Sequence, residues 1–544
     1  MRVCAAVAMI AALCGGRKPD LMVEGAANSI GDVPILGTIR ELSGDAYEGR
    51  APGTRGEEKT VAWLSTRLKA MGLLPGNPDG TYRQTVPLFG FTSRPEAAFR
   101  RGDDALRPKF PSEFVAMSRH ASTETAVTAS ELVFVGYGIK APEYRWDDYK
   151  GLDARGKTLV MLINDPPLPD RKHPMELDES MFKGRAMTYY GRWTYKYEIA
   201  AKLGAAAVLI VHETDAAGYP YGVLSGSFGQ EQFELRGSSA GRVAVEGWLS
   251  LDTAKALFSL AGKDFYDMKA AALDRGFKPV PLGVAFDARV ENTFREIESP
   301  NVVAKIPGSD PKRKDEFVVY TAHWDHLGKD DRGIYHGAVD NASGVAAFLE
   351  VAAAFQRLPK APARSILFLA TTAEEKGLLG AEYYTLHPLY PLADTVADLN
   401  FESLNAWGMT TDLRLNGLDL TTLGRVAEGV AEAQHRELLG DPMPEKGSFF
   451  RSDHFPFARA GVPALDLGPG MYVIGEPQGF GRRKREEFIA LDYHKPSDEV
   501  KQGWDLRGMA QDAQALFRIG YAVAESKSRP EWQRGAQEEF KAAR

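Results

Sequence analysis

Three short apolar runs that end at acidic or histidine side chains constrain the fold of this chain more than any other feature. The runs span residues 317–320, 365–370 and 398–401, and the side chains that follow them are His323, Asp325, Glu374, Glu375 and Glu402. β-Branched and aromatic runs of this length are typical of buried strands in α/β proteins. Ligands bind at the carboxyl ends of such strands, so we expect these side chains to lie close together.

Two further residues complete a candidate metal site. Asp340 precedes an apolar-periodic run at residues 345–355, so its carboxylate is expected at a helix N-terminus, where negative charge is favoured. His494 lies in the segment Tyr493-His-Lys-Pro-Ser-Asp498. Imidazole and carboxylate groups suit zinc, and one carboxylate can bridge two ions about 3.5–4 Å apart. The set therefore indicates a two-metal hydrolytic site, in which Asp340 is suited to bridge the ions.

The order of these motifs resembles that of the M28 family of zinc metallopeptidases. The matching motifs are His-x-Asp at 323–325, Asp-Asn-x-Ser-Gly at 340–344, Glu-Glu at 374–375, Asn-x-Glu at 400–402 and Tyr-His-x-Pro-x-Asp at 493–498. The resemblance implies two zinc ions, with cobalt or manganese as substitutes. It gives one zinc to His323, Asp340 and Glu402, and the other to Asp340, Glu375 and His494. Glu402 departs from the family pattern, which more often has aspartate there.

The resemblance also assigns catalytic and substrate-binding roles. Glu374 is implied to be the general base, and Asp325 is implied to hydrogen-bond the back of His323 and fix its tautomer. Tyr493 adjoins a ligand, and we hypothesise that it hydrogen-bonds the tetrahedral oxyanion. The family further implies a cis peptide after Asp340. The loop that lines the substrate pocket in the family corresponds to residues 447–457, so its pocket candidates are Ser452, Asp453 and His454.

The resemblance implies an α/β fold, the three-layer α/β/α zinc-exopeptidase fold with a mixed, mainly parallel sheet and an inserted β-rich protease-associated (PA) domain. Residues 146–157, a following strand and Lys-Leu-Gly-Ala-Ala at 202–206 carry the PA resemblance. The expected division is a signal peptide at 1–16, the first part of the catalytic domain at 24–105, the PA-like domain at 106–297, the main catalytic domain at 298–525 and a charged, frayed tail at 526–544.

The first sixteen residues predict export. A single early positive charge precedes an apolar stretch of about a dozen residues that ends in small ones, as in secretory signals, and this stretch is too short to span a bilayer. Both cysteines, Cys4 and Cys14, lie in this segment, which excludes a cysteine nucleophile from the mature chain. We expect a periplasmic or secreted protein; a lipid anchor on Cys14 is less favoured because Leu13 stands where a small residue is wanted.

Composition and charge limit the classes of binding partner expected for this chain. The net charge of -7 gives no sign of nucleic-acid binding, and no later run predicts a transmembrane span. The expected substrate is a peptide with a free N-terminus, which makes the chain an aminopeptidase. A carboxypeptidase or dipeptidase of the same family, a glutaminyl-cyclase-like transferase with one metal, and a receptor-like relative without catalysis are the alternatives. The basic run 482–485 is expected to be an exposed loop, with the binding of an acidic substrate as the less favoured alternative. Four histidines fit no ligand position and are expected to be structural: His326, His336, His387 and His435.

Overall fold

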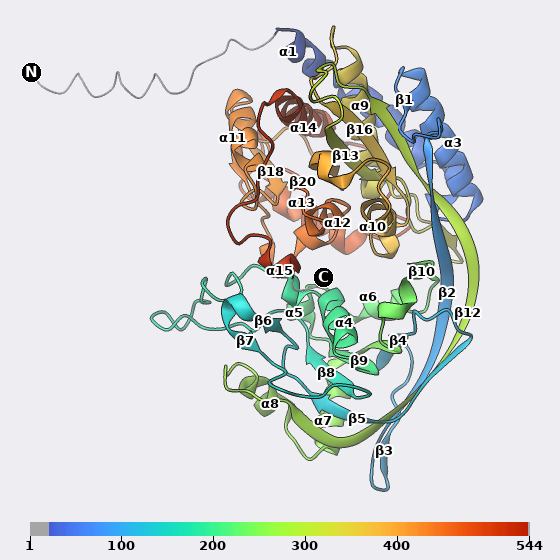
Figure 1. Ribbon diagram of the computed structural model, residues 1–544, viewed down its shortest axis with the longest axis vertical. Helices are drawn as coiled ribbons and strands as arrows, with labels where there is room; N and C mark the ends of the chain where they lie inside the picture. The colour runs from blue at the N-terminus through green and yellow to red at the C-terminus, as the bar shows by residue number, and fades with distance from the viewer. Residues whose placement is uncertain (1–20, 542–544) are drawn as a thin grey trace, which may run out of the picture.

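The computed structural model describes residues 21–541, which form two bodies joined by two long strands. The strands are β2 (Arg83–Arg101) and β12 (Val280–Ile306), and they run from one body into the other along one edge of the molecule in Figure 1. They pair antiparallel from Val302 opposite Arg83 to Ala285 opposite Arg100. One continuous β-ladder therefore connects the two cores.

The first body is built on a mixed sheet. Its central strands are parallel: β13 pairs with β16 and β17, and β17 pairs with β20. The antiparallel pairs lie further out, between β12 and β16 and between β18 and β20. In spatial order before β12 the strands are β19 (Glu437–Leu439), β18 (Asp412–Asn416), β20 (Ala464–Gly468), β17 (Thr395–Phe401), β13 (Phe317–His323) and β16 (Ser365–Thr371).

Helices cover both faces of this sheet, as the alternation of side chains along β13 shows. Val318, Tyr320 and Ala322 pack in the larger core, whereas Phe317 and Val319 pack in a smaller core on the opposite face. The larger core is formed with α1 (Leu21–Asn28), α2 (Asp32–Leu42), α3 (Arg55–Ala70), α9 (Gly344–Gln356), α11 (Leu423–Ala433) and α14 (Arg507–Glu525). The smaller core is formed with α10 (Leu379–Leu386) and α12 (His454–Arg459). The expected three-layer α/β/α arrangement is confirmed.

The strands of the second body continue the same large sheet beyond β12, and their core also takes in Phe450, Phe455 and Phe540 of the first body. Four strands are parallel there, β5 (Glu124–Phe134), β8 (Thr158–Leu162), β9 (Ala207–Val211) and β11 (Val245–Leu249), and β4 (Phe114–Met117) is antiparallel to β11. Its helices are α4 (Trp193–Lys202), α5 (Thr214–Ala217), α6 (Tyr221–Ser227), α7 (Leu251–Leu260) and α8 (Phe265–Ala271). The limits 106–297 for a PA-like domain stay a prediction.

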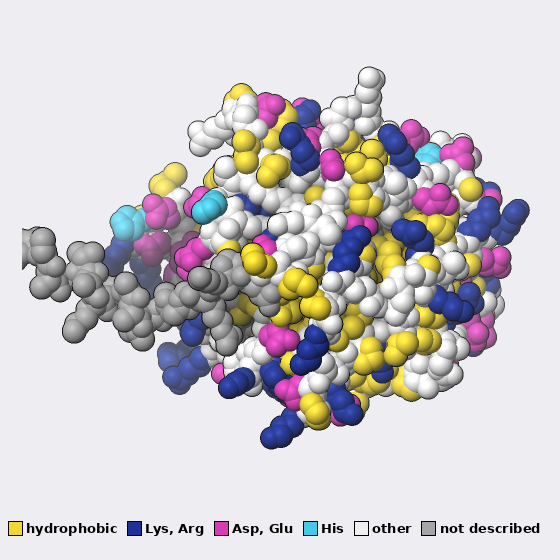
Figure 2. All heavy atoms as spheres, turned by 90° about the horizontal axis from the view of Figure 1, so that it is seen from above, with side chains coloured by type: hydrophobic (Ala, Val, Ile, Leu, Met, Phe, Trp, Pro, Cys, Tyr) yellow, Lys and Arg dark blue, Asp and Glu magenta, His cyan; other side chains and the backbone are white. Residues whose placement is uncertain are grey.

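The remaining elements are short or peripheral. Two small pairs lie outside the large sheet, β6 (Lys140–Ala141) with β7 (Trp146–Asp147) and β14 (Lys329–Asp330) with β15 (Gly333–Ile334). Three more short strands join the ladder of β2 and β12: β1 (Leu74–Pro75), β3 (Asp104–Leu106) and β10 (Gln232–Leu235). On the face shown in Figure 2, basic and acidic side chains are interspersed, so this face presents no extended field of one sign.

Two expectations for exposed segments are wrong. The basic run 482–485 lies within a helix, α13 (Phe480–Leu491). The charged tail is ordered through α15 (Glu538–Lys541), where Phe540 is 1% exposed and packs against Phe449 and Phe455. The aromatic contacts of Phe540 hold this tail to the rest of the protein. The high charge of the tail sequence gives no sign of these contacts.

The predicted signal peptide, residues 1–16, lies outside the described residues. Between residues 21 and 541, one helical stretch, Ala338–Gln356, has the length and apolar character of a membrane span, and 94% of it is buried within the protein. Burial of this kind is what the core helix of a globular domain requires.

Arg50 ties the loops of the first body together. Its side chain is 1% exposed, and the guanidinium donates hydrogen bonds to four backbone carbonyls. The acceptors are the carbonyls of Trp324 at 3.0 Å, Leu42 at 2.7 Å, His336 at 2.7 Å and Gly337 at 2.9 Å. Burial lowers the pKa of Arg50 to about 10, although nearby carboxylates, Asp498 first, act in the opposite direction. The loop after β13 is thereby fixed to the segment that leads to Asp340.

We expect Arg50→Lys to lower the free energy of unfolding by about 2–3 kcal/mol, because a lysine ammonium cannot reach four carbonyls in the geometry of a planar fork. Urea unfolding followed by tryptophan fluorescence measures the change. Arg40→Lys, at an exposed position on α2, is the matched control. Equal unfolding midpoints for the two variants would contradict the assigned role.

Candidate metal centre

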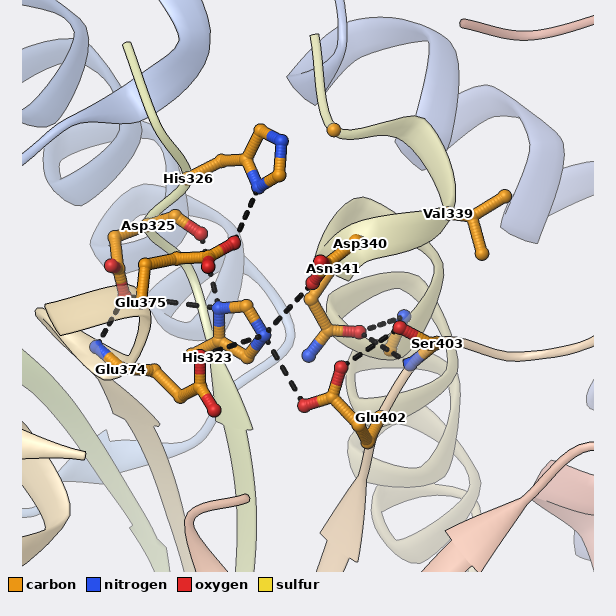
Figure 3. Close-up of polar contacts among 12 residues, drawn as sticks. His323, Asp325, His326, Val339, Asp340, Asn341, Glu374, Glu375, Glu402 and Ser403 are labelled. Atoms are coloured by element: carbon orange, nitrogen blue, oxygen red, sulfur yellow. Dashed lines mark hydrogen bonds and ion pairs between the residues drawn. The ribbon is translucent and has the colours of Figure 1, made fainter. Parts of the chain in front are cut away.

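The predicted ligands meet at the carboxyl ends of the central strands, and Figure 3 shows four of them: His323, Asp340, Glu375 and Glu402. His323 is the last residue of β13, and Glu402 directly follows β17. Glu374 and Glu375 begin the 3-10 turn η6 (Glu374–Lys376) after β16. The remaining two ligands are Asp340, in the turn η5 (Ala338–Ser343) before α9, and His494, three residues after α13. Segments far apart in sequence thus converge because parallel strands end at one edge of the sheet.

The five predicted ligands form two groups that share Asp340. In the first group, the His323 Nε2 atom lies 3.3 Å from Asp340 Oδ1 and 3.3 Å from Glu402 Oε2. In the second group, the His494 Nε2 atom lies 3.2 Å from Asp340 Oδ2 and 3.0 Å from Glu375 Oε2. The two oxygens of Asp340 therefore face two different pairs of partners, as a bridging carboxylate requires.

These spacings fit metal ligands. Ligands about 2.0–2.1 Å from a tetrahedral ion lie roughly 3.3 Å from one another. Three of the converging atoms, His323 Nε2, Glu402 Oε2 and His494 Nε2, have no hydrogen-bond partner among the described residues. Buried polar atoms without a partner are costly, and a metal ion would satisfy all three. The donor set of imidazole nitrogens and carboxylate oxygens suits zinc.

The acidic cluster dominates the electrostatics of the site. Burial disfavours a charged His323, yet the charges of Glu374 and Glu402 outweigh it and raise its pKa well above the usual value. Burial likewise disfavours a charged His494, and the charge of Glu375 outweighs it and raises the pKa of His494 well above its usual value. Burial raises the pKa of Glu374, and the negative charge of Glu402 adds to this effect. A cluster of this kind calls for compensating positive charge, which divalent cations supply.

Glu374 is held at the edge of the first group. Its Oε2 atom lies 3.8 Å from His323 Nε2, and its backbone N–H donates to Asp325 Oδ1 at 3.1 Å. The residue before it, Ala373, has a φ of 52°, in the left-handed region that non-glycine residues rarely adopt. The carboxylate is therefore adjacent to the ligands without being needed for either group of three.

The tautomer of His323 is fixed by a different atom than expected. The Nδ1 atom lies 3.0 Å from the backbone carbonyl of Asp325, whereas the Asp325 carboxylate is 3.8 Å away. That carboxylate instead accepts the Glu374 N–H, so it orients the segment that carries the predicted base. The carbonyl and Nδ1 leave Nε2 free to bind a metal, as a second hydrogen bond on a ligand histidine usually does.

The backbone around Asp340 is secured from both sides. The Asp498 carboxylate accepts hydrogen bonds from the backbone N–H groups of Val339 at 3.0 Å and Asp340 at 3.1 Å. The Asn341 side chain accepts from Gly344 at 3.0 Å and Ser403 at 3.2 Å. The peptide bond between Asp340 and Asn341 is cis, which confirms the expectation. These contacts fix the direction of the Asp340 carboxylate.

Sequence reasoning missed His326. Its Nδ1 atom lies 2.6 Å from Glu375 Oε1, and its ring is fully buried. One ligand atom each from His326, Asp340 and Glu375 lies within 4.8 Å of the other two. His494 is the better ligand, since its Nε2 approaches both Asp340 and Glu375 whereas His326 bonds the other oxygen of Glu375. His326 thus orients Glu375; its position just after His323-x-Asp325 is the one signal that could have revealed it.

The pocket candidates lie beneath the site. Ser452, Asp453 and His454 are 5%, 1% and 0% exposed. The Thr371 hydroxyl donates to the Asp453 carboxylate, and the Phe449 ring lies 4.7 Å from the His454 ring. Side chains this buried support the site from within, and a direct role with substrate stays a prediction. His336 and His387 lie apart from the ligands, with His336 paired to Asp45 and Glu499.

Comparisons with known proteins agree with this geometry. Residues 301–517 match the model of peptidase family M28. Aminopeptidase YwaD of Bacillus subtilis is 27% identical over 212 residues, which are 38% of this chain and 41% of the relative. The matched segment therefore spans less than half the length of that relative. A probable leucine aminopeptidase 2 of Aspergillus oryzae is 24% identical over 86% of this chain and 79% of its own.

The fold has a counterpart among solved structures. The aminopeptidase from Aneurinibacillus sp. strain AM-1 superposes with a TM-score of 0.50 and 19% identity, covering 92% of this chain and 95% of that chain. This likeness extends over both bodies. Within the matched residues 301–517 lie all five predicted ligands and Glu374. Residues 301–517 thus resemble peptidase family M28, and the match contains the whole candidate metal centre.

Proposed function

We propose that this protein is a peptidase that uses two zinc ions and removes N-terminal residues from peptides. The observation that carries the two-ion proposal is the placement of the two Asp340 oxygens, one 3.3 Å from His323 and the other 3.2 Å from His494. A site for one ion would need only one of these groups. Asp340, His323 and Glu402 would hold one zinc, and Asp340, Glu375 and His494 the other.

Bound zinc supplies Lewis acidity, which polarises a carbonyl and lowers the pKa of water. The residues of the chain supply positioning and proton transfer. Glu374 lies beside both groups and is the carboxylate that neither group requires, so it is placed to take a proton from the attacking water and return it to the leaving amine. The left-handed Ala373 and the hydrogen bond from the Glu374 N–H to Asp325 hold that carboxylate in place.

Tyr493 is the proposed partner of the oxyanion. Its ring stacks on the His494 ring, with centroids 3.8 Å apart and planes at 23°. The side chain is half-buried, and its hydroxyl forms a hydrogen bond with the Arg451 side chain. A hydroxyl held beside a ligand in this way is suited to donate a hydrogen bond to developing negative charge.

The aminopeptidase assignment rests on two arguments. The matched relatives from Bacillus subtilis and Aspergillus oryzae both carry the name aminopeptidase. The site also gathers carboxylates, whose oxygens can accept hydrogen bonds from the α-ammonium group of a free N-terminus. Two further proposals concern the whole chain. Residues 106–297 form a PA-like domain, supported by a core built mostly from these residues, and the protein is exported, supported by the pattern of residues 1–16.

We expect Glu374→Gln to retain its metal and to lose at least about 100-fold in kcat, because general-base catalysis typically contributes this much. Steady-state kinetics on the zinc-loaded variant measures the loss. Glu428→Gln, at an exposed position on α11, controls for the loss of one negative charge. Activity of Glu374→Gln within tenfold of the parent would rule out the assigned role.

Asp340→Asn is expected to bind less than about half of the zinc that the parent protein binds, because it removes the charge shared by both groups. Elemental analysis after dialysis against zinc gives the content without reference to activity. Asp331→Asn, at an exposed loop position nearby in sequence, should match the parent. Full zinc occupancy in Asp340→Asn would show that Asp340 is not the bridge.

The substrate assignment is tested with two compounds, leucine p-nitroanilide and an N-acetylated dipeptide with a free carboxylate. An aminopeptidase should cleave the first and leave the second intact, since the acetyl group removes the ammonium group that would donate hydrogen bonds to the carboxylates. Release of nitroaniline and chromatography of the dipeptide give the two rates. Faster cleavage of the blocked dipeptide would reassign the protein as a carboxypeptidase or dipeptidase with the same metal centre.

A further inference from the structure

Three arginine side chains lie close enough to Tyr493 to interact with it electrostatically, and Arg451 also forms a hydrogen bond with it. Arg451 follows the turn η9 (Ser448–Phe450), and Arg485 lies on α13. Arg192 comes from the second body, at the residue before α4. The Arg485 guanidinium carbon is 5.5 Å from the centre of the Phe488 ring, which in turn lies 6.1 Å from the Tyr493 ring. This chain of contacts continues to the ligand His494, on which Tyr493 stacks.

The contact between the two bodies brings Arg192 opposite Arg451. The Tyr189 ring lies 5.7 Å from the ring of Phe450, the residue before Arg451. The backbone N–H of Arg192 donates to the Tyr189 carbonyl at 3.1 Å, which keeps Arg192 close to this contact. In Figure 1, α4 is among the elements of the second body that face the first body near α12. The second body thus contributes a positive charge beside the metal centre.

No acidic side chain neutralises these three arginines. Across residues 21–541, no carboxylate oxygen lies within 4.0 Å of any of their guanidinium nitrogens, and the buried Arg192 Nε atom has no hydrogen-bond partner. Other arginines at the same boundary are paired, such as Arg185 with Glu445 at 3.0 Å and Arg459 with Glu198 at 3.1 Å. The absence of a partner is therefore particular to this cluster.

The cluster is enclosed yet accessible. Arg451 is exposed, and Arg192 and Arg485 keep part of their surface. Burial nonetheless lowers the pKa of Arg485, and burial followed by repulsion from Arg451 lowers the pKa of Arg192 to about 10. Like charges held together in an enclosed space are unfavourable, and an anion bound between them would relieve the repulsion.

The metal centre does not supply that anion once it is loaded. Two zinc ions would balance the four negative charges of Asp340, Glu374, Glu375 and Glu402, so the arginines would stand as excess positive charge. We propose that Arg192, Arg451 and Arg485 form a subsite that binds a carboxylate group of the peptide substrate. This inference rests on the proposed peptidase function. Guanidinium groups suit the task because each can donate two parallel hydrogen bonds to one carboxylate.

The carboxylate can belong to an acidic side chain or to the free C-terminus of a short peptide. Both sources are tested by calorimetric binding to the zinc-loaded Glu374→Gln variant, so that no turnover is needed. Three pairs of peptides differ only in the group of interest: Leu-Glu-amide against Leu-Gln-amide, Glu-Leu-amide against Gln-Leu-amide, and Leu-Leu against Leu-Leu-amide. We expect the acidic member of at least one pair to bind about tenfold tighter, as a charged hydrogen bond warrants.

Arg451→Gln and Arg485→Gln, each added separately, should reduce that preference to less than threefold. Arg483→Gln, an exposed position on the same helix as Arg485, should preserve it. Equal binding within all three pairs, or the same loss in Arg483→Gln, would overturn the subsite. Cleavage of leucine p-nitroanilide by the parent protein reports on the peptidase function alone, so the failure of one proposal is distinguishable from the failure of the other.

Discussion

The shared carboxylate of Asp340 is the constraint on which the rest of the first body depends. Its two oxygens must point at two different histidines, and this requires the turn before α9 to be held against the ends of β13 and β17. Asp498, Asn341 and Arg50 supply that support through hydrogen bonds to backbone groups. Charge geometry at one residue thus determines the loop structure around it.

Several residues in and beside the candidate metal centre have strained backbone conformations. Ala373, Ser403 and His494 all have positive φ, at 52°, 43° and 58°, and each is a predicted ligand or lies next to a residue of the site. Such conformations cost of order 1–3 kcal/mol each and persist where the surroundings fix them. For Ala373 and Ser403 the paired strands β13, β16 and β17 provide these surroundings, because their parallel ladder leaves the chain little freedom just after β16 and β17. The fold therefore sacrifices some stability to aim these side chains.

Much of the site could be predicted from the sequence because four of the five predicted ligands follow a recognisable strand or precede a periodic helix, and His494 lies in a recognisable motif. The contact between the His323 ring and the backbone carbonyl of Asp325 could not be predicted, because a backbone acceptor leaves no signal in the sequence. The role of His326 was missed because the sequence does not distinguish a histidine that only packs beside a ligand from one that forms a hydrogen bond with a ligand. The order of the charged tail depends on Phe540 meeting aromatic residues nearly a hundred positions earlier, and no local pattern encodes such a contact. The cluster of Arg192 with Arg451 likewise depends on how two bodies meet.

The ladder of β2 and β12 has a mechanical consequence. Inserted domains are often joined to their hosts by flexible linkers, but here paired strands of 19 and 27 residues pass through the junction. Bending such a ribbon requires its hydrogen bonds to deform together. The ribbon is therefore stiff, and it resists displacement of the second body relative to the first. Motions that widen or narrow the space between the bodies would then store elastic energy in the ribbon, and the resting separation would be restored without any ligand.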